Sequence, residues 1–196
     1  MKVKNFRLAA PWNVIEKDRG VYDFSDIDWM LEEAQKRDAE VILTVGRKLF
    51  RWPECHDPLW IIELKDVSVE SSVLEFLAQS IHHFKQYDNI VAWQVENEPN
   101  FPFGECVEPV PTEELFKQEV ALVRSIDDTR LIVSTDSGEL ASWLSFSGEV
   151  DKLGVSLYRV TENPTLGRLF YPMRPGFYQK KAKLAQAINK NIEEVY

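Results

Sequence analysis

The sequence predicts an α/β fold in which parallel strands form part of a (β/α)8 barrel. Apolar, strand-like runs alternate with amphipathic helical segments along the chain. The strand runs are apolar on both faces, which is typical of a parallel sheet covered by helices. Polar and aromatic residues follow the strands, whereas a Gly-rich phosphate turn is absent from the sequence. The alternative, a doubly wound open sheet, usually carries such a turn, so the barrel accounts better for the pattern.

Two strand–helix pairs are predicted in the first half of the chain. A short alternating run predicts a strand over Val3–Ala9, and FSDIDWMLEEAQKRD predicts the helix that follows it. We expect Ser25 to cap this helix, because Asp28 lies three residues further on. A fully apolar strand over Val41–Val45 ends at Gly46, and VLEFLAQSIHHFKQY predicts the next helix.

Three further pairs are predicted in the second half. NIVAWQVEN predicts a strand, and a helix begins after Thr112, whose side chain suits an N-cap. RLIVSTD predicts a strand over Leu131–Ser134, followed by a weaker helix in GELASWLSF. KLGVSLYR predicts a strand over Leu153–Tyr158, and FYQKKAKLAQAINKNI predicts the last helix. Because no Gly/Ser linker interrupts them, these five pairs predict a single domain over residues 1–196 that is three pairs short of a closed barrel.

The composition narrows the classes of partner. The chain carries a net charge of −9 with a pI of about 4.9, which disfavours nucleic acid and anionic membranes. No metal-ligand spacing or cofactor motif is present in the sequence, so neither a metal nor a cofactor is expected. The sequence shows no transmembrane run or signal peptide, which predicts a cytoplasmic protein if the chain is complete and permits a secreted one if it is a fragment.

The stretch IVAWQVENEPN suggests chemistry, because a buried strand ends on the carboxyl groups of Glu96 and Glu98. Charges there cost free energy unless they are paired, solvated or used. Partial burial raises the pKa of a carboxyl group, so Glu98 suits proton transfer, and Asn97 can bond a neutral hydroxyl group. Aromatic side chains offer flat faces for a sugar ring: Trp12, Trp52, Trp60, Phe101 and Phe103. These features favour glycoside chemistry, although Glu98 could equally cap a helix or pair with a nearby arginine, Arg7 or Arg47.

A longer pattern resembles a known family. FRLAAPWNVIEKDRGVYDFSDIDWMLEEAQKRDAEVILTVG, then RWPECH and WQVENEPN, is similar to the clan A retaining glycoside hydrolases, including cellulases and β-galactosidases with a (β/α)8 barrel. The resemblance implies that Glu98 is the general acid/base and that Asn97 precedes it at the end of strand four. It further implies a substrate site with Arg7 at the end of strand two, Tyr158 at the end of strand six, and Trp12 and Trp52 near the sugar.

The chain departs from the family in one respect that concerns the reaction. A retaining enzyme needs a second carboxylate as nucleophile, which the family carries as a Glu at the end of strand seven. Glu193 and Glu194 precede that strand, so we expect the nucleophile to be missing from this chain. We expect a partial barrel that lacks strand one and strands seven and eight, completed by a missing segment or a complementing chain. The alternatives are a non-catalytic carbohydrate-binding or interaction module, an inert fragment, or an unrelated α/β protein in which Glu98 is structural.

Several other polar residues admit a structural role. We expect Asp136 to cap the helix after Gly138, its alternative being a replacement base opposite Glu98. Glu96 is expected to point into the barrel and pair with Arg7 or Lys4.

The histidines and cysteines are the remaining candidates for a role in the site. His56, in the loop after Val41–Val45, could contact a sugar, whereas His82 and His83 are expected to be structural. Cys55 and Cys106 are expected to be unlinked thiols. A disulfide between them is the alternative, because both fall in loops on the active face of the barrel that the resemblance implies.

Overall fold

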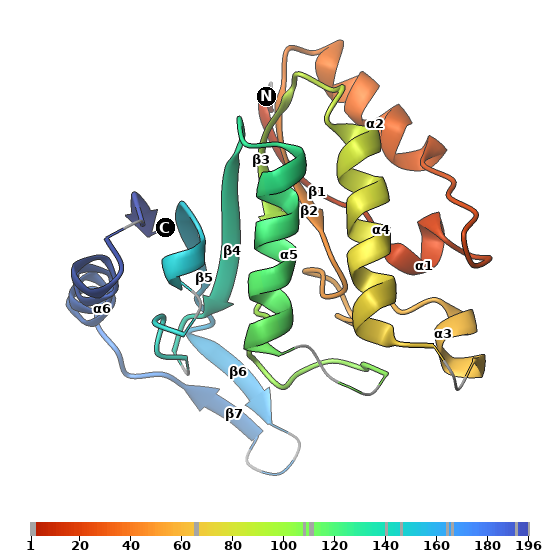
Figure 1. Ribbon diagram of the computed structural model, residues 1–196. Helices are drawn as coiled ribbons and strands as arrows, with labels where there is room; N and C mark the ends of the chain where they lie inside the picture. The colour runs from red at the N-terminus through yellow and green to blue at the C-terminus, as the bar shows by residue number, and fades with distance from the viewer. Residues whose placement is uncertain are drawn as a thin grey trace.

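The computed structural model describes residues 3–64, 67–107, 109, 112–139, 141–145, 147–163, 165, 167–190 and 192–195. A parallel sheet runs through them in chain order (Figure 1). Its strands are β1 (Asn5–Ala9), β2 (Glu40–Val45), β3 (Ile90–Val95), β4 (Leu131–Ser137), β5 (Lys152–Ser156) and β8 (Glu194–Val195). The predicted parallel α/β architecture is therefore confirmed. The sixth strand, β8, begins at Glu194, which was expected to precede the next strand; it pairs with the first two residues of β5.

Helices cover one face of this sheet, where α2, α4 and α5 lie side by side in Figure 1. The helices are α1 (Trp12–Ile15), α2 (Ser25–Gln35), α3 (Leu59–Glu63), α4 (Val69–Phe84), α5 (Glu113–Ile126) and α6 (Pro175–Ile188). Thr112 caps α5 as predicted, because its side chain accepts a hydrogen bond from the Leu115 backbone N–H. The predicted Ser25 cap is wrong: Ser25 is the first helical residue, and its N–H donates to Asp23 Oδ1 at 3.0 Å. Among the described residues, no helix is long and apolar enough to cross a membrane.

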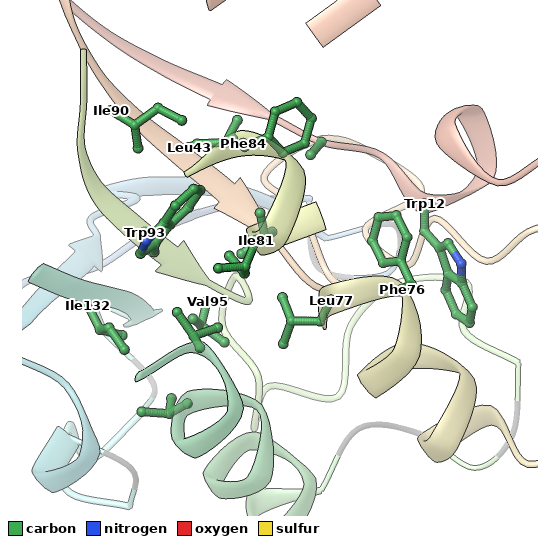
Figure 2. Close-up of a cluster of buried hydrophobic side chains, with 14 of the residues drawn as sticks. Trp12, Leu43, Phe76, Leu77, Ile81, Phe84, Ile90, Trp93, Val95 and Ile132 are labelled. Atoms are coloured by element: carbon green, nitrogen blue, oxygen red, sulfur yellow. The ribbon is translucent and has the colours of Figure 1, made fainter. Parts of the chain in front are cut away.

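The core lies between the sheet and these helices (Figure 2). Its strand side chains are fully or almost fully buried, as are those of α4 that face them: Leu43, Ile90, Trp93, Val95 and Ile132 against Phe76, Leu77, Ile81 and Phe84. Full burial of one such side chain contributes about 1.5–3 kcal/mol. Because every neighbouring pair of strands in this sheet is parallel, the carboxyl ends of the strands meet along one edge.

The segment after β4 differs from its prediction. The expected helix in GELASWLSF is wrong for the described residues there, which form turns before a short 3₁₀ helix, η1 (Ser147–Glu149). Trp143 has a φ of 68°, which a right-handed helix does not accommodate, and its indole N–H donates to the Ser137 carbonyl at 2.9 Å.

The segment after β5 also differs. The strand that was predicted to reach Tyr158 ends at Ser156 in the structure. An antiparallel hairpin follows, formed by β6 (Val160–Asn163) and β7 (Gly167–Phe170). The hairpin lies beyond the carboxyl ends of β4 and β5, at the bottom of Figure 1. It thereby adds a wall beside the edge of the sheet where the candidate residues gather.

Candidate active site

A cavity of about 610 Å³ opens at the carboxyl ends of the strands. Each of the first, third, fourth and fifth strands, or the turn after it, contributes a lining residue, and the β6–β7 hairpin forms another side. The polar lining consists of Arg7, Arg51, Glu54, Asn97, Glu98, Ser137, Glu139, Ser156, Thr161 and Glu162, and the aromatic lining of Phe50, Phe101, Phe103, Tyr158 and Tyr171. Such a mixture suits a neutral ligand that has many hydroxyl groups.

Glu98 reaches this cavity because the chain turns sharply after β3. Glu96 and Glu98 have φ values of 59° and 48°, a left-handed conformation that is uncommon outside glycine. The Glu98 backbone N–H donates to the carbonyl and hydroxyl oxygens of Thr135 on β4, at 3.1 and 3.2 Å. The turn is therefore fixed from the neighbouring strand, which leaves the partly buried Glu98 carboxyl group on the cavity wall.

Asn97 is held by three side chains. Its Oδ1 accepts hydrogen bonds from Arg7 Nη2 and Thr135 Oγ1, both at 2.9 Å. Its Nδ2 donates to Glu54 Oε2 at 3.2 Å. Because Oδ1 already has two donors, Asn97 can offer a ligand only its remaining N–H.

Arg7 joins this group from β1. Its Nε donates to Gln94 Oε1 at 2.6 Å, and its guanidinium group lies 4.1 Å from the centre of the Phe50 ring. Tyr158 follows β5 and lines the cavity with a largely exposed side chain, while its backbone N–H donates to Glu139 Oε2 at 3.2 Å. The structure thus brings together four residues that the sequence singled out: Arg7, Asn97, Glu98 and Tyr158.

Trp12 lies elsewhere, and the expectation that it is near the sugar is wrong. Its side chain is fully buried against α4, with its ring stacked on Phe76 at 5.6 Å, and its indole N–H donates to Glu16 Oε2 at 2.7 Å. The cause is local: α1 begins at Trp12, directly after Pro11, and carries the indole to the helical face of the sheet (Figure 2).

Trp52 and His56 lie outside the cavity lining. Trp52 is 61% exposed and contacts the cavity residue Phe103 edge to face at 5.6 Å, so it stands at the outer rim. His56 is partly buried, and its Nε2 lies 3.3 Å from the Arg51 carbonyl oxygen. Burial lowers the pKa of His56 below the ordinary histidine value. His83 lies 2.8 Å from Asp28 between α4 and α2, and His82 is exposed.

Two further carboxyl groups lie near Glu98. Burial raises the pKa of Glu54, a cavity residue that the sequence analysis overlooked although it follows directly after Trp52-Pro53 in a loop at the active edge. Burial, reinforced by the charge of Glu98, raises the pKa of Asp136 to about 6. The prediction that Asp136 caps a helix is wrong, because turns follow it in the described residues and its Oδ1 accepts from the Ser137 N–H.

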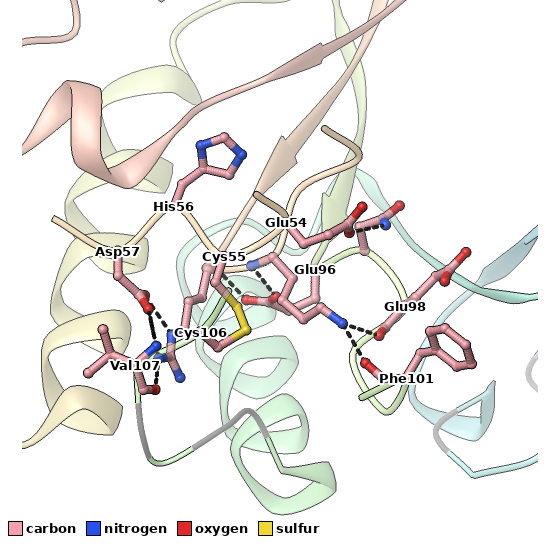
Figure 3. Close-up of a disulfide and its surroundings, with 12 residues drawn as sticks. Glu54, Cys55, His56, Asp57, Glu96, Glu98, Phe101, Cys106 and Val107 are labelled. Atoms are coloured by element: carbon pink, nitrogen blue, oxygen red, sulfur yellow. Dashed lines mark hydrogen bonds and ion pairs between the residues drawn. A yellow bond between two sulfur atoms is a disulfide. The ribbon is translucent and has the colours of Figure 1, made fainter. Parts of the chain in front are cut away.

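Two loops frame this site: the β2 loop, residues 46–58, and the β3 loop, residues 96–107. Cys55 and Cys106 form a disulfide between them, so the expectation of unlinked thiols is wrong (Figure 3). Arg47 pairs with Asp57 through two contacts, Nε to Oδ1 at 2.6 Å and Nη2 to Oδ2 at 2.8 Å. The expectation for Glu96 is also wrong: its carboxyl group bonds the β2 loop and Glu119 instead of Arg7 or Lys4.

The described residues contain no group of three or more His, Cys, Asp or Glu side chains that could hold a metal ion.

Comparison with known proteins finds no matching family model and no matching curated protein. Solved structures do match. A β-galactosidase from Rahnella sp. R3 has a TM-score of 0.62 at 9% identity, over 96% of this chain and 45% of that one. Xylanase 10B from Thermotoga maritima has a TM-score of 0.58 at 17% identity, over 96% and 72%. Xylanase 10C from Cellvibrio japonicus, solved with xylopentaose, has a TM-score of 0.57 at 12% identity, over 76% and 34%.

The chain therefore matches structures of clan A glycoside hydrolases over part of their length. It spans less than half the length of two β-galactosidases that it resembles, 36% and 45%. At these identities the likeness establishes the fold alone, which resembles part of a (β/α)8 barrel.

Proposed function

We propose that this chain carries the acid/base part of the catalytic centre of a retaining glycoside hydrolase, with Glu98 as the proton donor. The observation that carries the proposal is the left-handed turn after β3, which presents the Glu98 carboxyl group to the cavity beside an immobilised Asn97. Support also comes from the fold, since the matching solved structures include β-galactosidases and xylanases.

The reaction would proceed by double displacement. Glu98 protonates the bridging oxygen as the glycosidic bond breaks, while a second carboxylate attacks the anomeric carbon. Glu98, now ionised, then takes a proton from the water that releases the sugar. No cofactor takes part in these steps.

We place the nucleophile on a strand beyond those described. Retaining enzymes hold the two carboxyl groups about 5–5.5 Å apart. Glu194 does not suit this role, because it begins β8 and contacts Lys152 Nζ at 3.1 Å, at the start of β5 and the opposite edge of the sheet. Residues 1–196 would then form one incomplete catalytic domain, and the isolated chain would bind sugar without hydrolysing it.

The cavity suits an oligosaccharide. The remaining N–H of Asn97 can donate to a sugar hydroxyl, and the adjacent Glu54 carboxylate can accept from the same group. Phe50, Phe101 and Tyr158 supply apolar surface for the C–H faces of sugar rings. Arg7, Tyr158 and the rim residue Trp52 would complete the substrate-binding set.

The test compares Glu98→Gln with the parent in the protein that contains this chain together with its nucleophile. Loss of the general acid lowers kcat/KM, which reports the first displacement, by about 10²–10⁴-fold for glycosides with poor leaving groups, whereas kcat/KM for dinitrophenyl glycosides, which need no protonation, falls far less. Glu105→Gln, in the same loop but exposed and outside the cavity lining, is the matched control. An equal loss for both leaving groups would refute the assignment of Glu98.

Calorimetric titration of the isolated chain with xylo-, galacto- and manno-oligosaccharides tests the substrate class. Binding is expected, and its absence would contradict the proposed sugar site. Binding by a full-length protein that hydrolyses none of these sugars would favour a carbohydrate-binding module instead.

A further inference from the structure

Five ionisable side chains are buried beneath the turn that carries Glu98. They are Arg47, Lys48 and Asp57 of the β2 loop, Glu96 of the β3 loop and Glu119 of α5, and their side chains are almost wholly removed from solvent. Buried charges are costly unless they are paired and hydrogen-bonded, so their mutual arrangement calls for an explanation.

Two of these residues hold the loops to each other in opposite directions. Glu96 reaches the β2 loop, where its Oε1 accepts from the Arg47 backbone N–H at 2.5 Å and its Oε2 from the Lys48 N–H at 2.6 Å. Lys48 reaches back to the β3 loop, where its Nζ donates to the carbonyl oxygens of Glu98, at 2.9 Å, and Phe101, at 2.7 Å (Figure 3). The Lys48 amine therefore fixes the backbone of Glu98 itself.

The β2 loop is shaped around the Glu96 carboxylate. Gly46 has a φ of 110°, and a Cβ atom there would lie only 2.2 Å from Glu96 Oε1. Since Glu96 and Glu98 both adopt a left-handed conformation, contacts from outside the turn must maintain it. The Lys48 amine supplies two of these contacts, at the carbonyl oxygens of Glu98 and Phe101.

With Lys48 charged, the charges in this cluster balance when the two buried glutamates share one proton. Arg47 is paired with Asp57, and Lys48 lies near Glu96, which receives two backbone hydrogen bonds. The carboxyl group of Glu119 hydrogen-bonds that of Glu96, which requires a proton between them. Its Oε1 has no partner among the described residues. Burial, followed by the charge of Glu96, raises the pKa of Glu119 well above its ordinary value.

We propose that Lys48 is a positioning residue for Glu98, and that the single proton shared by Glu96 and Glu119 keeps Lys48 in place. The charged groups near this glutamate pair are Arg47 and Lys48. Arg47 is paired with Asp57, and Lys48 also interacts with the charges of Glu54 and Glu98. As the pH rises and the proton is lost, a second negative charge is buried beside Glu96, the carboxylate whose charge attracts Lys48. The positioning role rests on the proposed function, whereas the shared proton does not.

The activity test uses Lys48→Met, which keeps most of the stem and removes the amine, in the protein that contains this chain together with its nucleophile. Displacement of Glu98 by about 1 Å lowers kcat/KM roughly 10²-fold for glycosides with poor leaving groups, with much less effect on kcat/KM for dinitrophenyl glycosides. Lys117→Met, on the exposed side of α5, is the matched control. A loss that is equal for both leaving groups, or no loss, overturns the positioning role.

The shared proton is tested on the chain itself by NMR titration of the backbone amides of Glu98 and Phe101. In the parent these signals shift as the pH rises through the pKa of the glutamate pair. Glu54 and Asp136, whose carboxyl groups also lie near Glu98, shift these signals in every variant. Glu119→Gln keeps a hydrogen-bond donor but has no proton to lose, so the step that belongs to the pair disappears, whereas Glu114→Gln, at an exposed position of α5, leaves it unchanged. An unaltered shift in Glu119→Gln, or none in the parent, overturns the proposal. Since no catalysis is measured, this result stands even if Glu98→Gln disproves the glycosidase function.

Discussion

Removing the disulfide between the β2 and β3 loops should destabilise the protein more than most single substitutions. We take Cys55→Ser combined with Cys106→Ser as the perturbation. The two cysteines are 51 residues apart in the sequence, so the cross-link removes the entropy of closing a loop of that length from the unfolded chain. At 25 °C this corresponds to about 4 kcal/mol of lost unfolding free energy.

Urea unfolding followed by tryptophan fluorescence measures the difference. Complete curves are needed for both proteins, because the chain without the cross-link exposes more surface when unfolded and its m-value rises. Reductant should lower the stability of the parent to that of the double variant and leave the variant unchanged. A loss below about 1 kcal/mol would refute the reasoning. It would mean that the Arg47 and Asp57 contacts with Val107 already hold the loops, or that the unfolded chain stays compact.

Four other changes test separate parts of the structure. Phe84→Ala, in the core, should cost about 3–5 kcal/mol in urea unfolding. Gly46→Ala should cost at least about 1–3 kcal/mol, because its φ is 110° and the new Cβ meets Glu96, whereas Gly176→Ala, which meets nothing, should be near neutral. The pKa of Asp127 is lowered: burial acts to raise it, but hydrogen bonds from Thr129, Arg130 and Trp93 outweigh burial. Asp127→Asn should therefore lower the unfolding free energy at neutral pH. The difference between variant and parent should fade as the pH falls through the pKa of the folded state. Glu54→Gln should weaken oligosaccharide binding about 10-fold by calorimetry.

The parallel sheet and the meeting of Arg7 with Asn97 and Glu98 followed from the sequence for a single geometric reason. The carboxyl ends of parallel strands share one edge, so residues that directly follow different strands must come together there. The same argument failed for Trp12. It predicts at which edge of the sheet a residue lies, but it does not predict toward which face of the sheet the side chain points. Proline and the four residues of α1 decided that direction.

The disulfide and the β6–β7 hairpin could not be predicted from the sequence, each for a different reason. Two cysteines 51 residues apart carry no pairing information until the β2 and β3 loops are placed side by side. The β6–β7 hairpin has a loop that lacks the Asn-Gly or Asp-Gly pair that signals a tight turn. Glu119 did leave a signal: it lies three residues after Phe116 and four before Val123, hence on the buried stripe of α5. An acidic side chain on such a stripe predicts a buried carboxyl group that needs a partner.

The strand order of the sheet bears on how the chain acquires its structure during synthesis. Each strand up to β5 pairs with the one made just before it, so most native pairings join segments that leave the ribosome in succession. Both cysteines precede β4 in the sequence, so an oxidising environment can cross-link the β2 and β3 units before β5 has left the ribosome. The growing polypeptide would then carry a covalently secured platform onto which the later strands add one at a time.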